Sequence, residues 1–122
     1  MRFTRDVSAG INLVRAYGGG ELRINDTVYR GAVVLSAAVV LHEAQIFDLE
    51  GLLAIDTARI MALDPEVLLL GSGTRQTFPP ASFSARYLSK GIGFEAMDTG
   101  AACRTYNVLV GEQRRVVAML LA

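Results

Sequence analysis

Two apolar runs, each followed at once by a glycine-bearing turn, constrain the fold of this chain more than any other feature. The first run, Val67 to Leu70, leads into the turn Gly71 to Arg75, which reads Gly-Ser-Gly-Thr-Arg. The second run, Ile92 to Met97, leads into a turn that starts at Asp98. If the two runs are adjacent parallel strands, their turns lie side by side at the sheet end where α/β folds place ligand sites.

Helical patterns alternate with apolar strands through residues 52–122. Asp56 or Thr57 can cap a first helix, Pro79-Pro80 can open a second that Gly91 closes, and Gly111 is expected to end a third. The expected order is a helix over 56–63, a strand over 67–70, a helix over 81–89, a strand over 92–97, a helix over 100–110 and a strand over 115–121. This alternation predicts an α/β fold with a mixed, largely parallel central sheet and right-handed crossovers.

The first part of the chain, residues 1–45, has the alternating pattern of β-strands instead. Strands are expected over 12–17, 21–25 and 28–41, the last either continuous or interrupted near Gly31. The three glycines from Gly18 to Gly20 permit a turn with positive φ between the first two strands. We therefore predict an antiparallel β-meander packed against the sheet, within a single domain over residues 1–122.

Composition excludes several classes of protein. Hydrophobic residues make up 52% of the 122, and twelve basic residues balance twelve acidic ones, so neither disorder nor nucleic-acid binding is expected. The longest apolar run, Ala32 to Leu41, is too short to span a bilayer as a helix. Residues Met1 to Asp6 open no signal-peptide core. A cytoplasmic protein with one reduced cysteine, Cys103, is the expectation.

The same two turns carry a family resemblance. The stretches Gly71 to Arg75 and Gly91 to Asn107, with the Tyr-Gly-Gly-Gly turn that starts at Tyr17, resemble the small proteins related to mitochondrial complex I assembly factor 3. The bacterial and archaeal relatives of that family have no known function. The resemblance implies a three-layer α/β fold with a packed β-meander, and it supplies no catalytic residues.

For the mitochondrial relatives, the resemblance implies a role in assembling respiratory complex I through protein partners at the inner membrane. This sequence lacks the targeting extension of those relatives, so we expect a bacterial cytoplasmic protein, peripheral to the inner membrane through its partners. The meander could leave an exposed edge that pairs with a second copy, which would give a homo-oligomer.

The turns themselves form the candidate site for a ligand or partner. The helix that follows Asp98 is expected to offer the amides of residues 101–103 to an anion, with Arg75 and Arg104 adding charge. A purely structural interpretation competes with this one, because small residues let a helix pack closely on a sheet while Asp98 or Thr99 caps it. The candidate residues are Gly71, Ser72, Gly73, Thr74, Arg75, Asp98, Thr99, Gly100, Cys103 and Arg104.

The sequence gives little support for a catalytic site or a metal site. Cys103 would lie in the first turn of a helix, where the dipole lowers a thiol pKa, but nothing brings the only histidine, His42, close to it. We therefore expect Cys103 to be a small buried residue rather than a reactive one. No ligand spacing indicates a metal, and no motif indicates a cofactor. Three hypotheses follow: a non-enzymatic adaptor or assembly factor, a small-molecule or anion-binding domain that could be an enzyme, and a thiol switch at Cys103.

Overall fold

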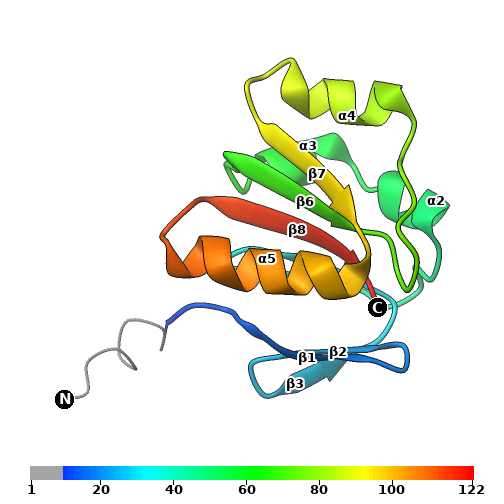
Figure 1. Ribbon diagram of the computed structural model, residues 1–122, viewed down its shortest axis with the longest axis vertical. Helices are drawn as coiled ribbons and strands as arrows, with labels where there is room; N and C mark the ends of the chain where they lie inside the picture. Colours follow the sequence, from blue (N-terminus) through cyan, green and yellow to red (C-terminus); the bar gives the residue numbers. More distant parts are fainter. Residues whose placement is uncertain (1–9) are drawn as a thin grey trace.

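The computed structural model describes residues 10–122 as two β-sheets and four helices (Figure 1). The expectation that Met1 to Asp6 open no signal-peptide core lies outside the described residues. The smaller sheet is the N-terminal meander, in the order β1-β2-β3. The larger sheet has five strands in the order β5-β4-β8-β6-β7. The predicted mixed α/β fold with an antiparallel meander is confirmed.

The meander forms where the sequence places its turns. Its strands are β1 (Val14–Gly18), β2 (Glu21–Ile24) and β3 (Thr27–Tyr29), paired antiparallel in sequence order. Gly18, Gly19 and Gly20 all have positive φ, as the first turn requires. Asn25 makes the second turn with a φ of 54°. Leu22 and Ile24 are buried, so one face of the meander packs on the rest of the molecule.

The five-stranded sheet is mixed. Its strands are β4 (Ala32–Leu35), β5 (Val40–Glu43), β6 (Val67–Gly71), β7 (Gly93–Met97) and β8 (Val116–Leu121). The strands β8, β6 and β7 run parallel, whereas β4 pairs antiparallel with both β5 and β8. The carboxyl ends of three parallel strands therefore meet at one edge of the sheet.

The helices are α2 (Leu49–Leu53), α3 (Thr57–Met61), α4 (Ala81–Leu88) and α5 (Thr99–Gly111). Asp48, Asp56 and Asp98 cap α2, α3 and α5 through their side chains. Helix α4 starts after Pro80 without a side-chain cap, because the N-cap residue Pro80 has no polar side chain; its carbonyl accepts from the amide of Phe83 (2.9 Å). The predicted helix starts at Asp56, Pro80 and Asp98 are thus confirmed.

Each face of the larger sheet carries its own core, which produces the layers of the fold. One core joins α5 and the meander to the sheet and contains Leu22, Leu69 and Tyr106. The other lies between the sheet and α2, α3 and α4, and contains Leu68 and Leu70. Successive residues of β6 therefore point into opposite cores, which explains its continuous apolar run. Figure 1 shows α5 on one side of the sheet with the meander beside it.

Three local expectations differ from the structure. The segment 28–41 was expected as a third meander strand, but it contributes to three strands, because it breaks at Gly31 (φ 85°) and again before β5. Strands β4 and β5 belong to the larger sheet. Helix α2 was not expected. Helix α5 includes Gly111 as its last residue. The turn that follows is made by Gln113, whose φ of 64° lets the amide of Arg114 bond to the carbonyl of Leu109.

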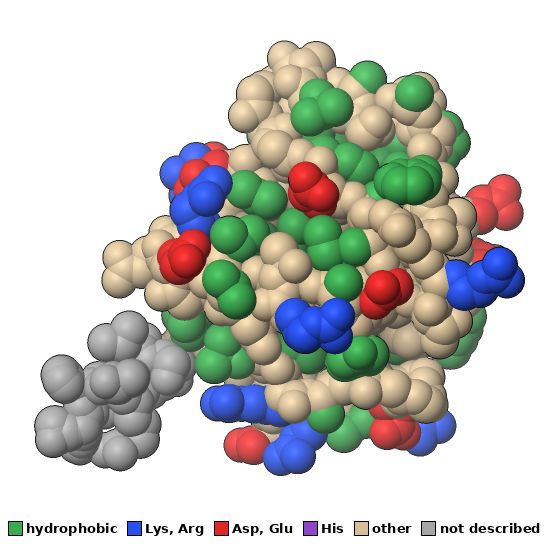
Figure 2. Space-filling view, viewed as in Figure 1, with side chains coloured by type: hydrophobic (Ala, Val, Ile, Leu, Met, Phe, Trp, Pro, Cys, Tyr) green, Lys and Arg blue, Asp and Glu red, His purple; other side chains and the backbone are tan. Residues whose placement is uncertain are grey.

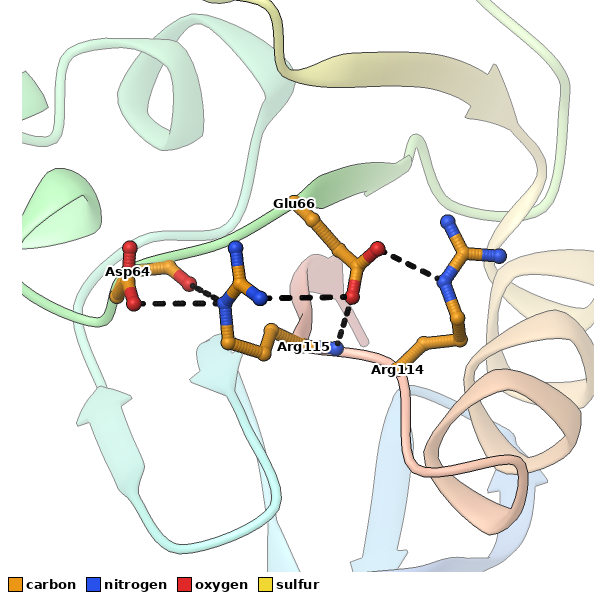
Figure 3. A network of polar contacts seen from close by, with 4 residues as sticks. All are labelled: Asp64, Glu66, Arg114 and Arg115. Carbon is orange, nitrogen blue, oxygen red and sulfur yellow. Dashed lines mark hydrogen bonds and ion pairs between the residues drawn. The ribbon is translucent and has the colours of Figure 1, made fainter.

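A polar network fixes the opposite edge of the sheet, where β6 and β8 begin (Figure 3). Glu66 accepts hydrogen bonds from the side chain of Arg114 (3.0 Å) and from the backbone amide of Arg115 (3.1 Å). The Arg115 side chain in turn donates to the carbonyl of Asp64 (3.1 Å). The bond from the Arg115 amide, together with the Arg114 side chain, lowers the pKa of Glu66 below its ordinary value of 4.5.

Candidate functional site

The two predicted turns lie side by side, because β6 and β7 are parallel neighbours with Gly71 opposite Met97. The turns are also bonded to each other. The amide of Ser72 donates to the carbonyl of Met97 (2.9 Å), and the amide of Thr99 donates to the carbonyl of Gly73 (2.8 Å). In return, the amide of Gly73 donates to the Thr99 hydroxyl (2.8 Å). The turns therefore form one rigid unit at the carboxyl end of the parallel strands.

The two buried hydroxyls in this unit, those of Ser72 and Thr99, are occupied by the protein itself. Ser72 Oγ donates to the carbonyl of Arg75 (2.7 Å) and accepts from the amide of Thr77 (3.0 Å), which closes the turn after β6. Thr99 Oγ1 donates to the carbonyl of Leu121 (2.6 Å) and so connects α5 to the end of β8. Ser72 and Thr99 are the two buried polar residues of the described chain, and they shape the site without pointing a free group into it.

The glycines are required by close packing. A Cβ atom on Gly71 would lie 3.0 Å from Leu120 Cδ2 and 3.1 Å from Thr99 Cα. A Cβ atom on Gly100 would lie 2.1 Å from the hydroxyl oxygen of Tyr17, whose ring covers the start of α5. Gly73 has a φ of 97°, which a residue with a side chain rarely adopts. Close packing thus explains why residues 71 and 100 are small, and the backbone conformation explains the glycine at position 73.

A cavity of about 210 Å³ opens beside the turns, and the meander forms its third wall. Figure 1 shows the β1–β2 turn close to the end of β8 and the start of α5. The candidate residues that line the cavity are Gly73, Thr74, Asp98, Thr99 and Gly100. The lining also includes residues absent from the predicted set, namely Tyr17, Gly18, Gly19, Gly20, Glu21 and Ala122.

The positive-φ glycines of the β1–β2 turn were visible in the sequence as a hairpin signal and as part of the family resemblance, but not as part of a site. No local pattern shows that a hairpin near residue 19 will reach a turn near residue 99. That contact depends on the packing of the meander against α5, which is a tertiary feature. The cavity residues that the sequence did not predict are therefore those of the meander, because no local pattern indicates where the meander packs.

The helix start differs from the expectation of three free amides over residues 101–103. The side chain of Asp98 accepts from the amide of Ala101 (2.9 Å), and its carbonyl accepts from the amide of Ala102 (2.9 Å). Cys103 lies inside the helix, where its amide belongs to the helical ladder. Because Asp98 satisfies this terminus with its own carboxylate, the helix start is not an open anion site.

The two candidate arginines lie apart from the cavity lining. Arg75 is exposed and lines none of the hollows described for this face. Arg104 lines a neighbouring hollow between β1 and α5, and its guanidinium donates to the Tyr17 hydroxyl (3.3 Å). The charged groups on the cavity itself are Asp98 and Glu21, of which Glu21 is paired with Arg30. The cavity carries no basic side chain, so an anion would find no counter-charge in its lining.

Cys103 is buried, with 3% of its surface exposed, and burial raises the pKa of its thiol to about 12. Cys103 is thus the small buried residue expected, and desolvation outweighs the lowering that the helix dipole and the nearby Arg104 charge would produce. The sulfur remains a neutral thiol near neutral pH. His42 lies on β5, with Nε2 2.7 Å from the carbonyl of Arg30 and its ring edge-on to Tyr29.

Two further findings concern residues 10–122. No three His, Cys, Asp or Glu side chains gather there as a metal-ion site would require. None of the helices in that part of the chain is long and apolar enough to cross a lipid bilayer.

Comparison with known proteins identifies the family. Residues 14–121 match the family model described as "Protein of unknown function (DUF498/DUF598)". The chain belongs to this family. The match begins at β1 and ends with β8, so it includes the meander, both turns and the whole of the larger sheet.

Two bacterial relatives cover most of the chain. A Rhodobacter capsulatus protein, named as uncharacterised, is 34% identical over 93% of this chain and 86% of its own length. A Francisella tularensis protein named "13 kDa major membrane protein" is 31% identical over 88% of both. The resemblance to complex I assembly factor 3 is also confirmed. The Danio rerio protein named NADH dehydrogenase (ubiquinone) 1 alpha subcomplex assembly factor 3 is 28% identical over 96% of this chain and 67% of its length.

Solved structures of related proteins share the fold. A Bordetella parapertussis crystal structure has a TM-score of 0.78 at 35% identity, covering 93% of this chain and 97% of that one. A Bordetella pertussis solution structure, described as a Mth938-like domain, has a TM-score of 0.77 at 30% identity over 99% and 92% of the two chains. The family fold therefore has the meander and the mixed sheet together in bacterial members.

Proposed function

We propose that this chain is a non-enzymatic adaptor that helps assemble a protein complex, and that the complex is respiratory complex I. The observation that carries the proposal is similarity along almost the whole chain to proteins named as complex I assembly factors. The Danio rerio and Xenopus tropicalis factors are 28% and 27% identical over 96% and 98% of this chain. Such a match places the meander, the turns and the sheet in both groups of proteins, so a shared surface can serve a shared role.

The chemistry of the turns fits contact better than catalysis. The hydroxyls of Ser72 and Thr99 are occupied by backbone partners, and the thiol of Cys103 is held neutral by burial. A nucleophile needs a free, activated group. The fourth hydroxyl or thiol of the candidate set, Thr74, lines the cavity, but no histidine lines it as a base beside Thr74. A rigid surface made of short turns can instead present a fixed shape to a partner.

We place the protein in the bacterial cytoplasm, at the inner membrane through its partners. Two supports are the bacterial origin of the relatives at 31% and 34% identity and the name of the Francisella tularensis relative, which calls that protein a major membrane protein. A second copy of the chain is a further candidate partner, since β3 is an edge strand of the meander.

The test is a quantitative pull-down of tagged protein from native soluble and membrane fractions. We expect wild type to enrich complex I subunits over an untagged control in the membrane fraction. Thr74→Arg places a large charged side chain on the rim of the cavity and is expected to reduce that enrichment. Thr77→Arg is the matched control, because Thr77 is exposed in the same loop but does not line the cavity. Reproducible absence of complex I subunits from wild-type samples would end the assembly proposal.

The cavity of about 210 Å³ favours one alternative, a small-molecule-binding domain that uses the turns after β6 and β7. Its position at the carboxyl ends of parallel strands is where α/β folds bind ligands. The alternative predicts that a screen of small metabolites raises the Tm of wild type and of Thr77→Arg but not of Thr74→Arg. A hit that stabilises all three proteins equally would not use this cavity.

A further inference from the structure

A second hollow, of about 290 Å³, lies between β1 and α5 and shares Tyr17 with the cavity. Its floor is apolar and buried, since Val14 is 7% and Cys103 3% exposed. Its rim carries the side chains of Arg15, Tyr17 and Arg104. An apolar floor lowers the local dielectric, so a charge that sits above it interacts more strongly than it would on a flat surface.

The walls of the hollow are held in place by side chains of α5. The Asn107 amide group accepts from the backbone amide of Val14 (3.0 Å) and donates to the carbonyl of Val14 (2.8 Å). The preceding residue, Tyr106, donates through its hydroxyl to the carbonyl of Asn12, just before β1 (2.8 Å). These bonds fasten β1 to α5 across 93 and 94 residues of sequence. The hollow is thus a fixed feature of the packed protein.

A β-bulge explains why Arg15 reaches the rim. The β1–β2 register passes from Val14 opposite Ile24 to Ala16 opposite Arg23, which leaves Arg15 without a partner on β2. A bulge inserts one extra residue and re-aims a side chain, and bulges are frequent next to functional sites. Arg15 is exposed and lines the hollow together with Arg104.

Tyr17 positions the second arginine. Its hydroxyl accepts a hydrogen bond from the Arg104 guanidinium (3.3 Å) and therefore keeps its own proton available for another acceptor. The ring rests against Gly100, where any side chain would collide with it. Arg15, Tyr17 and Arg104 therefore line one hollow, which brings two arginines and one hydroxyl donor to the same part of the surface.

The positive charge of this rim is not neutralised within residues 10–122. Five other arginines form ion pairs there, namely Arg23, Arg30, Arg59, Arg114 and Arg115. Arg15 and Arg104 form none, and no acidic residue lines the hollow. Figure 2 shows this face of the molecule, with basic side chains over α5 and over the meander below it.

We propose that the hollow between β1 and α5 binds a carboxylate-bearing segment of a partner protein, with Arg15 and Arg104 as its two guanidinium donors. Guanidinium groups pair with carboxylates through two parallel hydrogen bonds, and the Tyr17 hydroxyl supplies a further donor. An acidic side chain would meet both charges while its neighbours cover the apolar floor. This inference rests on the proposed adaptor function, for which it names the contact surface and the chemistry of the partner.

The first experiment is an NMR titration of the whole chain with a blocked peptide of alternating glutamate and alanine. Its probes are the Arg15 and Arg104 side-chain Nε–H signals and the amides of Cys103 and Asn107. We expect these signals to shift with the glutamate peptide, to remain in place with the glutamine counterpart, and to return as salt rises. Inorganic phosphate forms a third arm. Shifts with phosphate alone would identify a small-anion site and overturn the proposal.

The matched variants are Arg15→Gln/Arg104→Gln and, as control, Arg75→Gln/Lys90→Gln. Both remove two positive charges from exposed side chains, and Arg75 and Lys90 do not line the hollow. We expect the first variant to bind the glutamate peptide at least about tenfold more weakly, because each lost charged hydrogen bond costs roughly one decade in affinity. The control is expected to bind as wild type does. Equal affinity in both variants would overturn the proposal, provided that circular dichroism shows both to be folded.

Pull-downs with the same variants separate this inference from the adaptor function. If wild type and Arg15→Gln/Arg104→Gln enrich the same complex I subunits equally, the adaptor function holds and the hollow is not its contact surface. If wild type enriches none but the glutamate peptide still binds at the hollow, the carboxylate site holds and the assembly role fails. Loss of enrichment in Arg15→Gln/Arg104→Gln alone supports both.

Discussion

Gly71 and Gly100 both lie in the turns of the candidate site, yet the same substitution should affect them differently. A Cβ atom on Gly71 meets the backbone of Thr99 and the side chain of Leu120 at 3.0–3.1 Å, and both residues are buried. A Cβ atom on Gly100 meets only the ring end of Tyr17, which is 49% exposed and can swing into solvent. The first collision is with a fixed group and the second with a movable one.

We therefore expect Gly71→Ala to lower the free energy of unfolding by about 1–3 kcal/mol, as overpacking of a core does. Gly100→Ala should change it by less than about 1 kcal/mol, because the gain in helix propensity offsets the displaced ring. Urea denaturation measures both. Gly100→Ala should also release the Arg104 side chain from Tyr17, visible as a shift of the Arg104 Nε–H signal. A larger loss for Gly100→Ala than for Gly71→Ala would contradict this account.

Thr99 offers a second prediction at the level of one side chain. Its hydroxyl links Gly73, α5 and the carbonyl of Leu121, and the residue is only 3% exposed. Thr99→Val keeps the shape but leaves the Gly73 amide and the Leu121 carbonyl without partners, at a cost of about 1–3 kcal/mol for each buried group. Thr99→Ser keeps the hydroxyl and should retain most of the stability. A larger loss for Thr99→Ser than for Thr99→Val in thermal denaturation would show that the methyl group, and not the hydroxyl, supplies the stability.

At the scale of elements, Glu66 joins the start of β6 to the end of α5 and the start of β8 (Figure 3). Its pKa in the folded protein lies below 4.5, so its contribution to stability is present above that value. The contribution is lost as the pH falls through the lowered pKa, because the carboxylate takes up a proton in both states there. We expect Glu66→Gln to have a lower Tm than wild type at neutral pH, and the difference to disappear in acid.

The control for that series is Glu95→Gln, which removes an exposed carboxylate that forms no ion pair within residues 10–122. Its Tm should follow the wild-type value at every pH. A Glu66→Gln curve parallel to wild type over the whole pH range would show that the carboxylate charge is not what joins these elements.

The elements themselves were predictable where a local signal coincides with the tertiary structure. The apolar run of β6, the cap at Asp98 and the prolines before α4 each act within a few residues, and each element forms where expected. Helix α2 escaped notice because its five residues carry no clear period, although Asp48 caps it. Residues 28–41 were misjudged because alternation identifies a strand but does not reveal which sheet it joins.

At the scale of the whole molecule, one part of the candidate site was predictable from local sequence signals and another part was not. The sequence brought the turns after β6 and β7 together through the rule for parallel strands. It could not supply the β1–β2 turn or Arg15, because both reach the site only through the packing of the meander on α5. Leu22 and Ile24 of the meander share one core with α5 and the larger sheet. Disturbing that core therefore tests the prediction that the chain forms a single domain.

Asn107 is the side chain that most directly joins these two parts. Asn107→Ala removes both hydrogen bonds to Val14, which is buried, so we expect a loss of about 1–3 kcal/mol for each group left unsatisfied. Because the core is shared, hydrogen exchange should accelerate in β8 as well as in the meander, and unfolding should remain a single transition. Val108→Ala, at an exposed neighbouring position, is the control and should leave exchange unchanged. Faster exchange confined to residues 14–29, with β8 unaffected, would instead show that the meander opens as a separate unit, and the hollow with Arg15 and Arg104 would then open with it.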